Sequence, residues 1–212
     1  MPGAAARSLV LDFLIAAAYF AAAKAGFRLA FVAEQVTTVW APAGIAVAAL
    51  LLGGFRFGPA IWLGAFTANA TTTAPLWTAF VVAGGNTFEA VAAAWILLHL
   101  PRFDIRLCRA RDVLALVALA ALDCAGIGAT IGVATLCAAG VQPWARASTL
   151  WFDWWLGDAI GAVIVAPAIV TAARHSWTRP EWTRAAAFVA GAFLITELVF
   201  GRATGLTSHP FE

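Results

Sequence analysis

The stretch WFDWWLGD at positions 151–158 holds the densest group of side chains that could do chemistry. At about 100° per residue in a helix, the three tryptophans of this stretch share one face with Asp158. Asp153 points about 140° away from Asp158, so the two acids cannot serve one partner as a catalytic pair. The indole rings and Asp158 predict a pocket for a ligand or a cation. The candidate residues here are Trp154, Trp155, Asp153 and Asp158.

The same stretch has a second interpretation. Tryptophans are enriched where a membrane helix meets the lipid headgroups, and a nearby acid can hydrogen-bond a neighbouring helix. In that case the stretch is an interfacial belt and not a binding pocket. The residues alone leave both interpretations open.

Two other pairs of residues could also form a site inside the membrane. Asn86 and Glu89 are three residues apart in an apolar run, so they could pin two helices by hydrogen bonds or line a polar cavity. Trp40 and Pro42 open another apolar run, and proline in a first turn predicts a helix start with free backbone N–H groups. Those groups could hold an anion, or be capped by the hydroxyl of Thr37 or Thr38.

No arrangement typical of an enzyme or of a metal site occurs in the sequence. The three cysteines lack CxxC spacing, the three histidines are isolated, and no serine lies in a GxSxG context. We therefore expect no catalytic residue, no metal ion and no cofactor.

The elements that carry these residues must lie in a membrane. Of the 212 residues 63% are hydrophobic and 11% are charged, which excludes a soluble domain and a nucleic-acid-binding protein. Because a spanning helix needs roughly 20 apolar residues, we predict an all-α, polytopic transmembrane bundle of about seven helices. The predicted segments are 9–31, 39–52, 57–74, 77–100, 113–139, 151–172 and 185–200. The second and third are short, and form either two crossings or one re-entrant hairpin around 53–59.

Polar side chains inside such segments are costly and tend to mark functional sites. Besides the residues named above, Asn69 lies near the end of the third segment and is a further candidate for signal sensing. Glycine pairs four residues apart, such as Gly128 with Gly132 and Gly157 with Gly161, predict close helix contacts.

The basic residues are distributed unevenly between the loops. With a cytoplasmic amino terminus, nine of them fall in inside loops and two, Arg146 and Arg202, in outside loops. The positive-inside rule therefore predicts an N-in orientation. Seven crossings would then leave the carboxyl terminus outside.

Four stretches resemble a known family in content, order and spacing: VWAPAGIAVAALLLGG (39–54), FRFGPAIWLGAFTAN (55–69), GNTFEAVAAAWIL (85–97) and DWWLGDAIGAVIVAPAIV (153–170). The family is the membrane-associated sensor domain of the first MASE type, found ahead of bacterial histidine kinases and diguanylate cyclases. The resemblance implies about eight helices in the bacterial inner membrane, a cytoplasmic output domain and dimers of the full-length protein. It implies recurrent residues at Trp40, Pro42, Gly44, Gly64, Asn69, Asn86, Glu89, Asp153, Trp154, Trp155, Gly157, Asp158 and Pro167.

We expect residues 1–212 to form a single sensory domain that lacks its last helix and its output domain. Its expected partners are the lipid bilayer, a small ligand or membrane protein, and a second copy of the full-length protein, with no nucleic acid. The alternative function is a small transporter or a substrate-binding membrane subunit, since broken helices often mark substrate sites.

Overall fold

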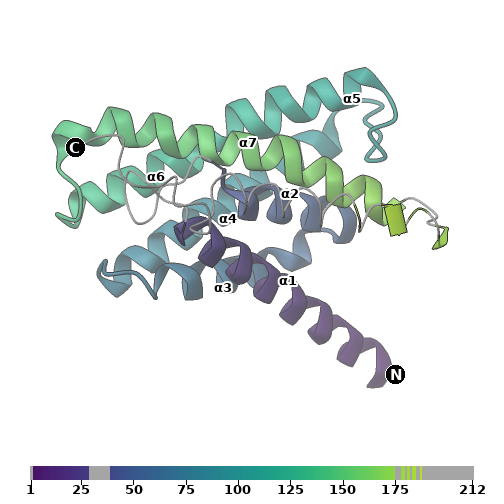
Figure 1. The fold of residues 1–212 in the computed structure, drawn as a ribbon, viewed down its shortest axis with the longest axis horizontal. Coiled ribbons are helices and arrows are strands. Elements are labelled where there is room, and N and C mark those ends of the chain that lie inside the picture. Colours follow the sequence, from purple (N-terminus) through teal and green to yellow (C-terminus); the bar gives the residue numbers. More distant parts are fainter. Residues whose placement is uncertain are drawn as a thin grey trace. The chain divides into compact units, whose positions relative to one another are not determined.

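A computed structural model describes residues 2–28, 39–174, and positions 178, 179, 181, 183, 184 and 187. Contacts divide the chain into two compact units, Met1–Arg174 and His175–Glu212. In the first unit the described residues form helices and turns without a strand, as expected for an all-α protein (Figure 1). Of the predicted helix at 185–200, the structure describes position 187 alone.

The described residues of the first unit form six helical rods. In chain order its elements are α1 (Pro2–Arg28), α2 (Ala41–Gly53), η1 (Phe55–Phe57), α3 (Gly58–Asn69), α4 (Leu76–His99), α5 (Ala110–Ala115), η2 (Leu116–Cys124), α6 (Ala125–Ala138), η3 (Trp144–Arg146) and α7 (Ala147–Arg174). The elements α5, η2 and α6 follow one another without a break and act as one rod. In its middle, η2 has the wider turns of a π-helix.

Four of the rods are long and apolar enough to cross a membrane: Ala6–Arg28, Leu76–His99, Ala110–Ala138 and Trp144–Arg174. The helices α2 and α3 are shorter, with 13 and 12 residues. They are joined through η1 and through Gly54, whose positive φ of 84° suits a residue without a side chain. They pack on different partners, α2 mainly on α7, and α3 on α1 and α4.

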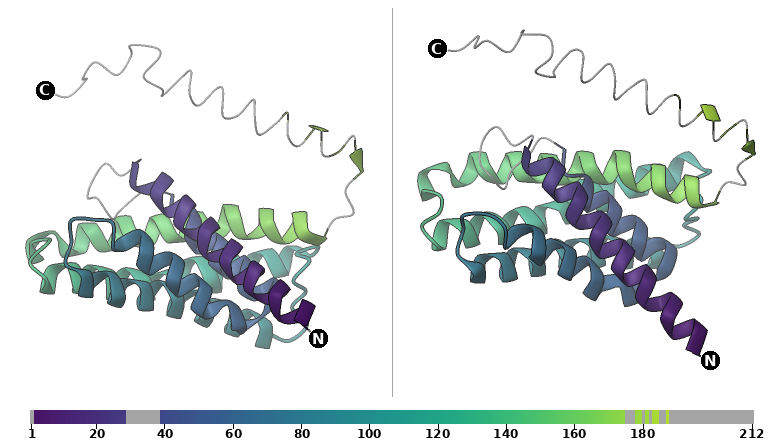
Figure 2. Two further views of the ribbon diagram at one scale, coloured as in Figure 1. Left: turned by 90° about the horizontal axis from the view of Figure 1, so that it is seen from below. Right: turned by 60° about the horizontal axis from the view of Figure 1, so that its bottom comes forward.

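The helices alternate in direction along the bundle, as Figure 2 shows. The amino-terminal part of α1, the turn at η1, the loop before α5 and the end of α7 lie at one end. A hydrogen bond of 3.5 Å from the Arg56 guanidinium to the Ser8 hydroxyl joins η1 to α1 there. Arginines predicted for the inside loops therefore gather at one end of this unit.

Small side chains fill much of the interior. Alanines on every long helix are fully buried, which lets the helix backbones approach closely. Among the residues whose burial the structure describes, seven buried side chains are polar, namely Asn69, Thr78, Asn86, Glu89, Asp112, Thr135 and Asp158. An unpaired polar group in an apolar interior is costly, so each of these side chains needs a hydrogen-bond partner or a functional reason to be buried.

Among the few described residues of the second unit, Thr178 and Glu181 form a local contact. The backbone N–H of Thr178 and its hydroxyl both donate to Oε2 of Glu181, at 2.8 and 2.7 Å. This is the contact expected when threonine begins a helix and a glutamate follows three residues later.

Candidate functional site: a buried polar centre

Six polar or amphipathic side chains, five from three helices and one from the residue before α2, meet inside the first unit, and we call this group the polar centre. Tyr19 comes from α1, Asn86 and Glu89 from α4, and Trp154 and Asp158 from α7. The sixth member is Trp40, which immediately precedes α2. Glu89 lies near the middle of α4 and Tyr19 near the middle of the α1 span, so the centre lies at mid-depth of the predicted spans.

Glu89 and Asp158 form the core of this centre. Their side chains are 5% and 1% exposed, and the two carboxyl groups lie in contact between α4 and α7, beside Gly128 of α6. The Glu89 carboxyl also accepts a hydrogen bond from the backbone N–H of Gly128 on α6. A methyl group on Gly128 would overlap that carboxyl. Gly128 thus makes room for an acidic side chain between three helices.

Trp154 completes the contacts of Asp158. Its indole N–H donates to the Asp158 carboxyl one turn along α7. Its ring lies on Gly132 of α6, where a Cβ atom would come within 2.5 Å of the indole. The two glycines predicted to bring helix backbones together instead accommodate the side chains of Glu89 and Trp154.

Tyr19 joins the other half of the centre. The Asn86 Nδ2 group donates to the Tyr19 hydroxyl at 3.2 Å, and the indole of Trp40 hydrogen-bonds the same hydroxyl. Tyr19 is 1% exposed and interacts electrostatically with both Asp158 and Glu89. Its hydroxyl therefore links α1 and the start of α2 to the acidic pair.

The start of α2 is fixed by α7. The backbone N–H of Trp40 donates to the carbonyl of Gly157 at 2.9 Å, and its own carbonyl lies directly on Gly161. Pro42 follows in the first turn and is fully buried. Since the Trp40 N–H already has a partner, it is not free to hold an anion. Thr37 and Thr38, the alternative caps, lie outside the described residues.

Two acceptor atoms of the centre have no partner. They are Oδ1 of Asn86 and Oδ2 of Asp158, both completely covered by protein. The ion pair found within the described part of the chain joins Arg111 to Asp112, so no described base neutralises the acidic pair. Among these same residues, no three His, Cys, Asp or Glu side chains form a metal-binding group. The centre thus offers negative charge and unused acceptors.

The remaining predicted residues lie apart from these contacts. Trp155 donates from Nε1 to the carbonyl of Leu122 on η2 at 2.8 Å, and stacks on Trp151 with ring centroids 6.2 Å apart. Asn69 donates to the carbonyl of Ala65 within α3 at 2.9 Å. Asp153 is half-exposed and is not among the described contacts of Asp158. The tryptophan face predicted as one wall is therefore divided, with Trp154 alone facing the acidic pair.

Tyr19 was not among the predicted site residues. Its residue type could have identified it, because Tyr19 is the single tyrosine of the chain and lies within an apolar run of alanines and phenylalanines. A hydroxyl at that depth needs a partner, which points to the interior of the bundle.

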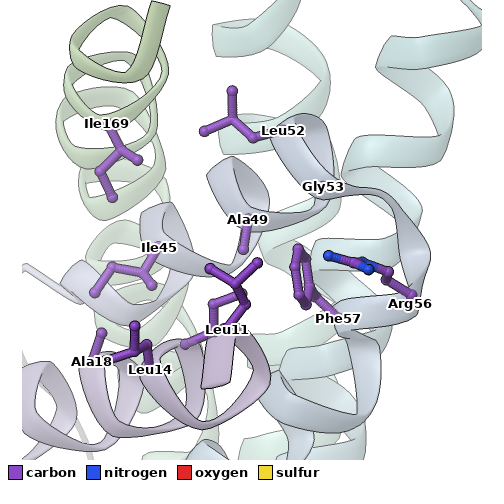
Figure 3. A pocket seen from close by; sticks show the side chains of 11 residues that line it. Leu11, Leu14, Ala18, Ile45, Ala49, Leu52, Gly53, Arg56, Phe57 and Ile169 are labelled. Carbon is purple, nitrogen blue, oxygen red and sulfur yellow. The ribbon is translucent and has the colours of Figure 1, made fainter. Parts of the chain in front are cut away.

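Apart from the polar centre, a hollow lies between α1, α2, η1 and α7, and we call it the groove. Its volume is about 480 Å³, and its lining is almost entirely aliphatic, including Leu14, Ile45 and Ile169 (Figure 3). The one charged side chain is Arg56, whose guanidinium lies over the Phe57 ring at 4.5 Å from its centroid. The groove provides apolar contact area and one cation, and no acid lines it.

Four long apolar helices around a buried polar centre define an integral membrane protein of the polytopic helical class. The family model for MASE1 matches residues 11–209. The chain therefore belongs to the MASE1 family, a family of membrane sensory domains. Neither the curated proteins nor the solved structures with which the chain was compared match it.

Proposed function

We propose that this chain is the signal-receiving part of a bacterial inner-membrane receptor and that the polar centre is where the signal acts. The output is a cytoplasmic kinase or cyclase domain working as a dimer, and the chain itself performs no catalysis. The observation that carries the proposal is the acidic pair at mid-depth, buried with unused acceptors and without a base. Polar groups of this kind inside a membrane are retained for function.

The arrangement of contacts suggests how a signal would travel. Glu89 and Asp158 connect α4, α6 and α7, while Tyr19 and Trp40 extend the connection to α1 and α2. A ligand or partner that binds one packing of these helices more tightly shifts the population toward that packing. Because α2 is anchored to the middle of α7 through Trp40, a movement of α7 also moves α2.

The proposed orientation places the amino terminus in the cytoplasm. It is supported by the gathering of arginines at the end of the unit that holds the start of α1, η1 and the loop before α5. Movement of α7 would reach that same end, since α7 terminates there.

The experiment is a chimera in which the chain drives a diguanylate cyclase output in a reporter strain. Two versions of the chimera are built, one with an added transmembrane helix before the cyclase and one without it. Whichever side of the membrane the carboxyl terminus faces, one of the two versions then has its cyclase in the cytoplasm. Output is recorded across growth conditions that differ in pH, salt and carbon source. We expect output that switches in at least one of these conditions.

Asp158→Asn and Glu89→Gln are compared with Asp153→Asn as the matched control, since Asp153 lies on the same helix outside the polar centre. We expect the first two to lock the output and the control to switch like the parent. If all three variants switch normally, the polar centre is not the place where the signal acts.

A further inference from the structure

We propose that the Glu89–Asp158 pair is a proton-binding site that holds one exchangeable proton. This inference rests on the proposed function, because the bound proton would be all or part of the signal that the domain senses. The chemistry of the ligand follows from four features of the polar centre.

The first feature is the contact between the two carboxyl groups. A hydrogen bond between two carboxyls needs a hydrogen on one of them, because a carboxylate can only accept. Two carboxylates in contact inside a membrane would also repel strongly, which favours a shared proton over two charges. The observed contact between Glu89 and Asp158 therefore fits the pair with one proton bound.

The second feature is the kind of atom that lacks a partner. In the polar centre these are Oδ1 of Asn86 and Oδ2 of Asp158, and both are acceptors. Asn86 is 7% and Asp158 1% exposed, so bulk water does not reach either side chain freely. Unused acceptors beside an acid call for a ligand that donates hydrogen or carries positive charge. An anion would add a further acceptor and more negative charge.

The third feature is the set of ionisable groups around the pair. From α1 it is faced by the Tyr19 hydroxyl, and from η2 by the thiol of Cys124, which interacts electrostatically with Glu89 and with Asp123. From α6 it meets the Gly128 backbone, and from its own helix α7 the indole of Trp154. None of these groups is basic, so the described surroundings offer the pair no cation other than a proton.

The fourth feature is the cost of losing the proton. When it leaves to water, the pair passes from one negative charge to two in contact, with no oxidation or reduction. Repulsion between these charges in an apolar interior favours their separation or the entry of water. Either change loosens α7 from α4, because the pair is the polar link between them.

The experiment is infrared difference spectroscopy of the full chain in lipid nanodiscs, between acidic and alkaline pH. We expect a protonated carboxyl band, at the high frequency of a poorly hydrated group, that disappears as the pH rises. The band should be absent from the Glu89→Gln/Asp158→Asn double variant and retained in Asp153→Asn. Selective ¹³C labelling of glutamate or aspartate carboxyls assigns the band in the wild-type chain even if the double variant fails to fold.

Two outcomes overturn the proposal. One is a wild-type difference spectrum in which no such high-frequency band titrates. The other is a band whose titration midpoint moves to lower pH when sodium chloride replaces choline chloride, because the pair would then be a sodium site. These spectra need no output domain. A titrating pair with a chimera that never switches would leave the proton site standing and refute the sensory role.

Discussion

The polar centre is closely packed and rich in hydrogen-bonding atoms, whereas the groove is open and almost wholly aliphatic. In the centre, glycines on α6 make way for an acid and an indole, and unused acceptors remain. In the groove, about 480 Å³ of space is lined by side chains that lipid or another helix could contact. In the described part of the chain the open volume and the buried polar groups therefore lie in different places, and the groove is not the site richest in chemistry.

Removing the indole that closes the centre should have the largest effect. Trp154 is buried and fills the space over Gly132, so Trp154→Ala leaves a large cavity and takes a donor from Asp158. We expect a loss of about 3–5 kcal/mol in the free energy of unfolding, the usual range for a buried aromatic residue. Reversible unfolding in mixed micelles measures it. Trp151→Ala is the control, and equal losses at the half-exposed Trp151 would show that the two tryptophans are not distinct.

Adding one methyl group where backbones touch should come next. In Gly161→Ala the new Cβ would overlap the Trp40 carbonyl, which is backbone and cannot move aside. We expect a loss of about 1–3 kcal/mol in unfolding free energy, as for other overpacked sites. Gly84→Ala on α4 is the matched control because its Cβ would meet open space. A Gly161→Ala protein as stable as Gly84→Ala would contradict the anchoring of α2 on α7.

Removing the tyrosine hydroxyl should have a similar or smaller effect. Tyr19→Phe keeps the ring but leaves Asn86 Nδ2 and the Trp40 indole without their acceptor. We expect a loss of about 1–3 kcal/mol, the cost of a buried polar group left unsatisfied. Thermal unfolding monitored by circular dichroism gives the comparison. If Tyr19→Phe unfolds like the wild type, the hydroxyl does not link α1 to the centre.

Filling the groove should have the smallest effect. Ala49 lines the hollow, so Ala49→Leu has space and should change the unfolding free energy by less than about 1 kcal/mol. Its neighbour Ala48 is fully buried, and Ala48→Leu should be clearly more destabilising. The same micelle unfolding experiment decides between them. Equal losses would mean that the groove is not open in the folded protein.

The sequence predicted the four long helices well because each is a long apolar run. The predicted segment 77–100 corresponds to α4 (Leu76–His99), and 151–172 to the apolar part of α7. The π-helical turns of η2 were not predicted. One contact there is the indole of Trp155 on the Leu122 carbonyl, and no pattern along a single segment encodes such a contact.

Most residues of the polar centre, though not Tyr19, were among the predicted candidates, whereas their pairings were not predicted. Helical spacing shows which residues share a face, so Asp158 and Trp154 were placed together correctly. It cannot show that Glu89, from another helix, meets Asp158. A helix face is also wide enough to hold Trp151 and Trp155 beside Trp154, although only Trp154 contacts the acid. Distinguishing them required the position of α6.

The most direct test of the central claim is the distance between α4 and α7 as a function of pH. Spin labels carried by non-natural amino acids are placed at the exposed positions Leu98 and Ala173, near the ends of the two helices. Pulsed electron resonance of the chain in nanodiscs then gives the distance distribution. We predict longer or broader distances at alkaline pH in the wild type and no change in Glu89→Gln/Asp158→Asn. Identical wild-type distributions at acidic and alkaline pH would contradict the claim that the charge of the acidic pair sets the packing of α7.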